Sequence, residues 1–259
     1  MLRLAETHGG SAPALVTASA GNHGRALAWA AGAAGMQLTV YVPRHAPATK
    51  LDAIRATAAE LRLCADYDEA EARAKEQAAR GTAVFISPYS HPDVIAGAGT
   101  VGLEIHEDWP DVDAIVVPVG GGGLISGIAL ALHGVSPSAA VYGVEVEASC
   151  PFTQSLAAGR IVPIEVRPTL ADGLAGNLDP DTVTFDLVKE RVSRIGIVGE
   201  LDLRNGIAGV VTKERLVVEG AGAAGVAAVL GGKLDVRDHR VAIVLSGANI
   251  DANTLKAIL

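Results

Sequence analysis

The stretch AIVVPVGGGGLISG, residues 114–127, joins a buried strand to a helix through four consecutive glycines. AIVVPV is apolar on both faces, as expected of a strand inside a parallel sheet, and an apolar helical stretch follows the glycines. A tight turn needs one or two glycines, so Gly120, Gly121, Gly122 and Gly123 exceed that need. Because backbone amides without Cβ atoms can turn inward around a phosphate, the stretch predicts a phosphate-binding loop.

The same alternation of strand and helix continues along the chain. Short β-branched stretches at 14–19, 38–42, 83–87, 114–120, 140–146 and 240–247 are expected to be buried strands. Parallel neighbours need a crossover, so the pattern predicts an α/β fold with two open, twisted parallel sheets and helices on both faces. Two prolines in SPYSHPD (87–93) interrupt the pattern. We therefore expect a small α/β domain over 14–91 and a larger domain formed by 1–13 and 92–259.

Composition limits the kinds of partner. The 259 residues are 49% hydrophobic, which suffices for a large core, and the net charge is -8 with Lys and Arg scattered. This charge gives no electrostatic footprint for nucleic acid or an anionic membrane, and no apolar run reaches the ~20 residues that span a bilayer. Cys64 and Cys150 lack CxxC spacing, which argues against a disulfide framework or a zinc site. We expect a cytoplasmic protein.

A second loop, TASAGNHG at residues 17–24, lies between an expected strand and the helical stretch RALAWAAGAA. Ser19, Asn22 and His23 would present a hydroxyl, an amide and an imidazole at a helix N-terminus, which suits a carboxylate or a ring oxygen. An N-cap serine with an asparagine in a turn is the structural alternative. The loop taken alone leaves both readings open.

Two further segments match G-x-G-x-x-G by spelling. GAGTVG (97–102) follows a run too short for a strand, so packing accounts for it better. GAGAAG (220–225) has a better context for a dinucleotide site. The acid that should end the next strand is missing, because Asp235 and Asp238 precede that strand and Asp251 lies beyond it. A dinucleotide site is therefore not expected.

Taken together, the segments resemble pyridoxal-phosphate (PLP) enzymes of the tryptophan-synthase-β-like fold (fold type II), and most of all the threonine/serine dehydratases. The resemblance covers essentially the whole chain, and SAGNHG with GGGGL is a specific pair. The segments that carry it, in order, are TASAGNHGRALAWAA, PRHAPATKLDAIRATAAEL, SPYSHPDVIAGAGT, VVPVGGGGLISG, LADGLA, VEGAGAAGVAAVL and VLSGANID.

The resemblance implies where the cofactor would be held. Asn22 would hydrogen-bond the ring hydroxyl of the cofactor, and Ser246 would meet its pyridine nitrogen. The phosphate would be held by the backbone of Gly120, Gly121, Gly122, Gly123 and Leu124. The carboxylate of a small amino-acid substrate would be held by Ser19, Ala20, Gly21 and His23.

The implied reaction is β-elimination of L-threonine or L-serine to a 2-oxo acid and ammonia. In the family, the α-proton goes to the lysine that carries the cofactor, and that lysine would here fall before Met1. All six lysines of the chain, from Lys50 to Lys256, follow the SAGNHG loop. We therefore expect a chain truncated at its N-terminus, without the catalytic lysine and inactive as it stands. The alternative is a non-catalytic PLP-binding or ligand-binding pseudo-enzyme or partner subunit.

Two other departures narrow the expectation. Serine racemases of this group place a serine where this chain has Ala20, which cannot move a proton, so racemase activity is disfavoured. Some relatives bind a divalent cation through a glutamate corresponding to Glu145 and an aspartate at the position of Pro151. No metal is therefore expected, and Glu145 and Glu147 would form a solvated strand end. The resemblance also implies a homodimer or a homotetramer.

Overall fold

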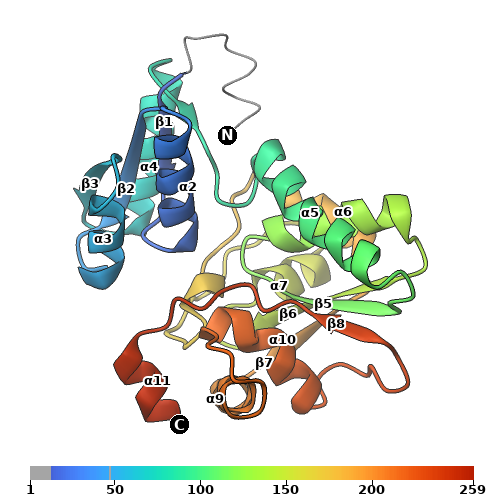
Figure 1. The fold of residues 1–259 in the computed structure, drawn as a ribbon. Helices are drawn as coiled ribbons and strands as arrows, with labels where there is room; N and C mark the ends of the chain where they lie inside the picture. Colours follow the sequence, from blue (N-terminus) through green and yellow to red (C-terminus); the bar gives the residue numbers. More distant parts are fainter. Residues whose placement is uncertain (1–12, 47) are drawn as a thin grey trace. The chain divides into compact units, whose positions relative to one another are not determined.

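Two four-stranded parallel sheets carry the fold of the chain (Figure 1). The computed structural model describes residues 13–46 and 48–259, and the chain divides into two units, Met1–Asp93 and Val94–Leu259. The predicted α/β class with two parallel sheets is confirmed. The predicted domain assignment stays a prediction, and residues 1–12 of its first segment lie outside the described residues.

The first unit holds sheet A, with parallel strands in the order β3-β2-β1-β4. Its strands are β1 (Leu15–Ala18), β2 (Leu38–Pro43), β3 (Glu60–Cys64) and β4 (Val84–Phe85), and its helices are α2 (Asn22–Ala33), α3 (Ala48–Arg55) and α4 (Tyr67–Ala79). All four residues of β1 are buried, because β2 and β4 flank the strand. The loop after β1 therefore opens at the middle of the sheet.

The second unit holds sheet B, with parallel strands in the order β7-β6-β5-β8. The strands are β5 (Ala114–Pro118), β6 (Ala140–Val146), β7 (Arg194–Val198) and β8 (Val241–Ile243). The helical segments are α5 (Pro92–Asp108, beginning at the end of the first unit), α6 (Gly123–Val135), α7 (Pro151–Ala158), η1 (Asp172–Leu174), α8 (Thr184–Arg191), α9 (Glu200–Gly209), η2 (Val210–Glu214), α10 (Gly220–Leu230) and α11 (Ala252–Ile258).

Strand β5 is buried on both faces, as its apolar sequence predicts. Ile115 and Val117 belong to a core cluster with residues of α6 and α8, whereas Val116 belongs to a cluster with residues of α9 and α10. This alternation places α6 and α10 on opposite faces of sheet B (Figure 1). In the described residues, no helix is long and apolar enough to cross a membrane.

Two strands, β3 and β7, were not expected from the sequence. Both lie at sheet edges, where one side of the backbone lacks a strand partner and polar residues are common. β3 has the sequence ELRLC and is mostly exposed, and β7, RIGIV, begins with an exposed arginine. These short strands therefore lack the continuous apolar run that marked the central strands.

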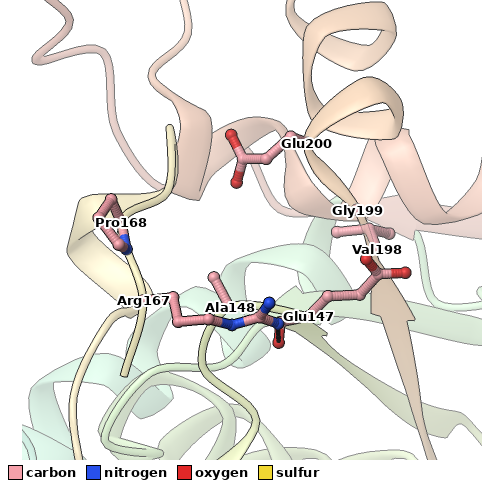
Figure 2. Close-up of a pocket in the computed structure, with 7 residues that line it drawn as sticks. All are labelled: Glu147, Ala148, Arg167, Pro168, Val198, Gly199 and Glu200. Carbon is pink, nitrogen blue, oxygen red and sulfur yellow. Dashed lines mark hydrogen bonds between the residues drawn. The ribbon is translucent and has the colours of Figure 1, made fainter. Parts of the chain in front are cut away.

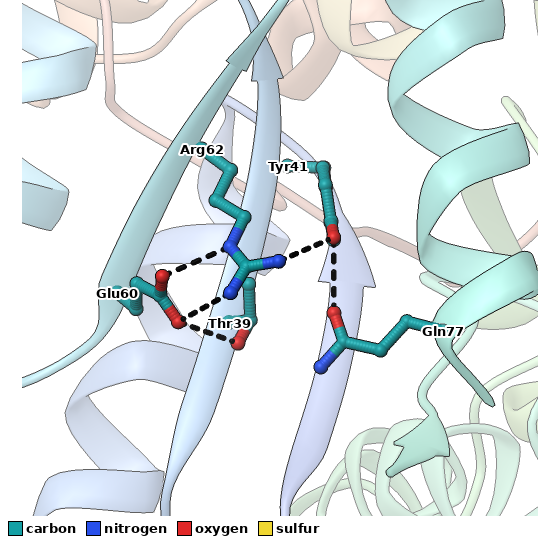
Figure 3. A network of polar contacts seen from close by, with 5 residues as sticks. All are labelled: Thr39, Tyr41, Glu60, Arg62 and Gln77. Atoms are coloured by element: carbon teal, nitrogen blue, oxygen red, sulfur yellow. Dashed lines mark hydrogen bonds and ion pairs between the residues drawn. The ribbon is translucent and has the colours of Figure 1, made fainter. Parts of the chain in front are cut away.

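A polar network ties the edge strand β3 to the rest of the first unit (Figure 3). Arg62 donates to both carboxylate oxygens of Glu60 (2.9 and 3.2 Å) and to the hydroxyl of Tyr41 (3.0 Å). Tyr41 in turn donates to Gln77 of α4 (3.0 Å). The hydrogen bonds from Arg62 lower the pKa of Glu60. The network joins β2, β3 and α4 in one surface layer.

Glycines set the distance between α5 and α6 in the second unit. A Cβ at Gly127 would lie 2.3 Å from the carbonyl oxygen of Ile95, so α6 approaches α5 with backbone alone. A Cβ at Gly99 or Gly102 would lie 3.2 or 3.1 Å from carbonyl oxygens of α6. Gly99 and Gly102 of GAGTVG therefore serve packing, as the sequence predicts, whereas a Cβ at Gly97 would meet nothing within 4 Å.

This packing yields a stability prediction. Gly127→Ala should destabilise the second unit by about 3 kcal/mol, because a methyl group would push α5 and α6 apart. Urea unfolding followed by the fluorescence of Trp109, in a Trp29→Phe background, measures the change, because Trp109 is then the only tryptophan left.

Gly134→Ala is the matched control on the same helix, since a Cβ there meets nothing within 4 Å. It should be neutral or stabilise by up to ~1 kcal/mol. Equal midpoints for the two variants would contradict this account of the α5–α6 contact.

Candidate functional site

The four-glycine loop connects the end of β5 to the start of α6, as predicted. Gly122 is the N-cap of α6 and has a left-handed backbone with φ +85°. A Cβ at Gly122 would lie 2.6 Å from the ring of Phe152, which is fully buried. A Cβ at Gly120 would lie 3.1 Å from the carbonyl oxygen of Gly173. Both conformation and space therefore require glycine at Gly122, and space favours it at Gly120.

The loop presents backbone amides at a helix N-terminus. The first N–H groups of a helix lack intrahelical acceptors, and the helix dipole makes this end partly positive. The first turn of α6 carries no acidic residue that would repel an anion. Glycine backbone, unscreened by side chains, thus fits the phosphate of the implied cofactor.

Ser246 lies in the segment that follows β8, at the same edge of sheet B. β8 pairs with β5 in parallel, and the amide of Val244 bonds the carbonyl of Val116 (3.0 Å). Because parallel strands end at the same sheet edge, the glycine loop and Ser246 follow neighbouring strand ends. Ser246 is exposed. The structure therefore brings the predicted phosphate loop and the predicted ring-nitrogen partner to one edge of one unit.

Glu219 holds the Ser246 segment and was not predicted. The side chain is buried, and its Oε2 accepts from the amide of Asn249 (3.1 Å), while its own amide donates to the carbonyl of Gly247 (3.0 Å). A Cβ at Gly222 would lie 2.7 Å from the same Gly247 oxygen. The sequence signal was an acid directly before GAGAAG, at the N-cap of α10, which can reach a neighbouring loop.

The loop Ser19–Gly24 lies in the first unit, after β1 and at the start of α2. Asn22 is the first residue of α2 and is exposed, and the hydroxyl of Ser19 accepts from the amide of Gly21 (3.3 Å). A Cβ at Gly24 would lie 2.0 Å from the carbonyl oxygen of Ser19, so the loop folds tightly on the first turn of α2. These predicted residues share one loop at the carboxyl edge of sheet A.

His23 of this loop points back toward β1. Its Nε2 lies 3.2 Å from Oγ1 of Thr17, whose hydroxyl donates to the carbonyl of Ile86 (2.8 Å). Because that hydroxyl proton is used, Thr17 can only accept from the imidazole, which assigns the proton to Nε2. Burial lowers the pKa of His23 to about 4, against the opposing effect of the Ile86 carbonyl, and nearby His91 lowers it further. The imidazole is therefore neutral near pH 7 and supports the loop from below.

Each unit thus supplies part of the predicted site. The second unit gathers Gly120–Leu124 and Ser246, and the first unit gathers Ser19, Ala20, Gly21, Asn22 and His23. That both sets act on one ligand stays a prediction.

Glu145 corrects one expectation from the sequence. The predicted solvated strand end is wrong for Glu145, which is 0% exposed, whereas Glu147 is exposed. The carboxylate of Glu145 accepts from the amides of Phe152 (2.8 Å) and Thr153 (2.9 Å) and from the hydroxyl of Thr153 (2.6 Å). Burial raises the pKa of Glu145, and these hydrogen bonds oppose the rise. Among the described residues, no three His, Cys, Asp or Glu side chains are grouped as metal ligands.

Two surface hollows are lined by none of the predicted site residues. One, of about 130 Å³, lies where β6 and β7 end and carries two carboxylates and one arginine (Figure 2); it is lined by Glu147, Ala148, Arg167, Pro168, Val198, Gly199 and Glu200. The other, of about 510 Å³, adjoins the Arg62 network and is lined by Tyr41, Arg62, Arg73, Glu76, Gln77, Arg80 and Thr82. The arginines of the second hollow pair with Glu60, Glu69 and Glu76, so its positive charge is largely compensated.

The state of His23 can be tested by titration. Its ring resonances should stay constant from pH 8 down to about 5 and shift with a midpoint near 4. In the unfolded chain the imidazole binds a proton near pH 6.5, so folding stability should fall as the pH drops from 6.5 to 4.

His23→Gln keeps a donor toward Thr17 but cannot titrate. The difference in unfolding free energy between the wild type and this variant should therefore change only within that pH window. A His23 midpoint near 6.5 in the folded chain would contradict the neutral, buried imidazole.

Comparison with known proteins shows the family of the chain. The family described as "Pyridoxal-phosphate dependent enzyme" matches residues 1–247. An L-threonine ammonia-lyase of Thermotoga maritima is 45% identical over 246 residues, which are 95% of this chain and 61% of that protein. The chain thus spans less than two thirds of that relative's length.

Solved structures of similar proteins have the same fold as this chain. The processed form of threonine deaminase isoform 2 from Solanum lycopersicum has a TM-score of 0.87 at 31% identity, covering 95% of this chain and 72% of that one. Maize serine racemase has a TM-score of 0.86 at 34% identity, covering 94% and 75%. With the family match over nearly its whole length, this chain belongs to the pyridoxal-phosphate dependent enzymes.

Proposed function

We propose that this chain forms the cofactor-binding and substrate-binding framework of a PLP-dependent ammonia-lyase that eliminates water and ammonia from L-threonine or L-serine. The observation that carries the proposal is the glycine loop, an anion-binding helix start at the same sheet edge as Ser246. The 45% identity to an L-threonine ammonia-lyase supports the reaction type.

Within this proposal the cofactor contacts are backbone amides and neutral side chains. The amides of Gly120–Leu124 hold the phosphate, Ser246 meets the pyridine nitrogen, and Asn22 bonds the ring hydroxyl. When bound, pyridoxal phosphate supplies an electron sink for the charge left at Cα as the α-proton departs. The hydroxyl of Ser246 brings no negative charge to the ring nitrogen, unlike a carboxylate, which favours elimination over longer storage of charge.

The substrate carboxylate is held by the loop after β1. Ser19, Ala20 and Gly21 supply a hydroxyl and amides next to the N-terminus of α2, where a negative charge is favoured. The neutral His23 carries its proton toward Thr17, so we assign it to holding the loop rather than to a charged contact. Ala20 has no proton to exchange, and this supports elimination over racemisation.

The ion pairs and exposure of five lysines support the expectation that this chain by itself has low activity. Lys75 pairs with Glu71 (2.9 Å) and Lys233 with Asp202 (3.5 Å), and Lys189, Lys213 and Lys256 are exposed. Covalent catalysis needs a buried, positioned amine. The absence of such an amine among these five favours, as the second candidate, a non-catalytic PLP-binding or ligand-binding protein or partner subunit.

Assembly and location are part of the same proposal. A homodimer or homotetramer would give partners to large apolar side chains such as Trp29 and Leu201, which are 73% and 71% exposed. Two cysteines without a disulfide suit the reducing cytoplasm.

Elimination can be tested with an external base. With pyridoxal phosphate added, the chain should release 2-oxobutanoate from L-threonine only slowly, and ethylamine should raise the rate, because a small amine can take the α-proton in place of a lysine. Asn22→Ala and Ser246→Ala should each lower the stimulated rate about tenfold, the effect of one lost hydrogen bond.

Two matched controls use the same replacements at exposed positions. Asn205→Ala on α9 and Ser138→Ala, between α6 and β6 at the opposite edge of sheet B, should leave the rate unchanged. Unchanged rates in Asn22→Ala and Ser246→Ala would refute the site map. A chain that binds the cofactor yet releases no 2-oxo acid with ethylamine would favour the non-catalytic candidate. Borohydride-dependent attachment of the cofactor to Lys50 would overturn the low-activity expectation.

A further inference from the structure

We propose that Thr184 and Glu145 are positioning residues for the phosphate loop, an inference that rests on the proposed function. Neither residue belongs to the cofactor-binding or substrate-binding set predicted from the sequence. Both are 0% exposed. Thr184 bonds the loop directly, and Glu145 acts on it through Phe152.

Thr184 fixes one peptide group of the loop. Its Oγ1 donates to the carbonyl oxygen of Gly121 (2.8 Å), and it in turn lies 2.8 Å from Oγ1 of Thr182. Since the Thr184 proton goes to Gly121, the proton between the two threonines comes from Thr182. The Gly121 carbonyl is therefore held toward the start of α8 by a relay of two hydroxyls.

The orientation of that carbonyl determines where the next amide points. In a trans peptide the C=O of one residue and the N–H of the next are antiparallel, and the described residues contain no cis peptide. When Thr184 draws the carbonyl of Gly121 toward α8, the N–H of Gly122 must point away from α8. Thr184 thus turns the N–H of Gly122 away from α8, which leaves it available to a phosphate in the proposed site.

Glu145 supports Gly122 of the loop through Phe152. Its carboxylate bonds the amides of Phe152 and Thr153, and the N-cap residue of α7, Cys150, makes no side-chain cap. The start of α7 is therefore fixed by β6, which keeps the Phe152 ring against Gly122. Gly122, with its φ of +85°, is packed between this ring and Thr184. A Cβ built on Gly122 would lie 3.1 Å from the Cβ of Thr184.

The phosphate loop is thus set before a ligand arrives. Pre-organised donors bind an anion more tightly because less conformational freedom is lost on binding. A change at Thr184 or Glu145 should therefore weaken binding of the phosphate group and spare binding of the pyridine ring.

A pair of probes that differ only in the phosphate isolates this effect. Pyridoxamine 5'-phosphate and pyridoxamine are titrated into the full chain by calorimetry, and the ratio of their dissociation constants is the readout. Thr184→Val should reduce the advantage of the phosphate-bearing probe about tenfold, because the Gly121 carbonyl loses its donor. Thr184→Ser keeps the hydroxyl and should retain the wild-type ratio.

Thr100→Val is the matched control, since Thr100 also donates from Oγ1 to a backbone carbonyl, that of Gly97 (2.8 Å), on the exposed face of α5. It should leave the ratio unchanged.

Glu145→Gln is a second variant, paired with Asp202→Asn, which removes the charge of another helix-capping carboxylate at Gly199. Glu145→Gln should lower the ratio, and Asp202→Asn should not.

The outcomes separate the inference from the proposed function. A wild-type chain that binds both probes equally would overturn the phosphate site, and the positioning role with it. If the wild type prefers the phosphate-bearing probe but Thr184→Val and Glu145→Gln keep that preference, the positioning role alone is refuted. Should Thr184→Val fail to fold, Thr184→Ala is judged by the same ratio.

Discussion

The close passage of backbone over Phe152 at Gly122 is the constraint on which the rest of the second unit depends. A side chain at Gly122 would collide with the ring, and its left-handed φ would strain any other residue. Because the chain passes there as bare backbone, a short loop can connect the end of β5 at Pro118 to the start of α6 at Gly123. The amides at this helix start then face the edge where β8 also ends.

Buried carboxylates fix the segments around that edge. Glu145 accepts from the first amides of α7, and Glu219 accepts from the amide of Asn249 beyond Ser246. A buried carboxylate is costly unless hydrogen bonds satisfy it, so each acid favours one arrangement of the backbone that surrounds it. At the carboxyl edge of sheet B, the buried carboxylates of Glu145 and Glu219 thus hold the start of α7 and the segment after β8 in place. The first unit uses a neutral imidazole, His23, under its own loop.

The sequence predicted the central strands and the two loops because their signals are local. Burial on both faces makes β5 apolar throughout and β1 apolar except for Thr17, and the four glycines or SAGNHG follow within one residue of the strand end. The edge strand β3 was missed because its exposure allows polar residues in it, and β7 was missed because a glycine interrupts its short apolar run. Glu219 was not predicted, and Glu145 was wrongly predicted to be solvated. Glu145 is buried by α7 and Glu219 by the Ser246 segment, and only the fold brings these segments close to the two side chains. Contacts between segments that are far apart in the chain leave no local pattern in a single sequence.

In the proposed site, the amides of Gly120–Leu124 bind the phosphate of the cofactor. Titration of pyridoxamine 5'-phosphate into 15N-labelled protein, followed by amide chemical shifts, tests it most directly. The largest changes should fall on the amides of Gly120 to Leu124, and pyridoxamine should leave the shifts of these amides nearly unchanged. Changes centred on the arginines beside Tyr41, with the glycine loop unaffected, would contradict it.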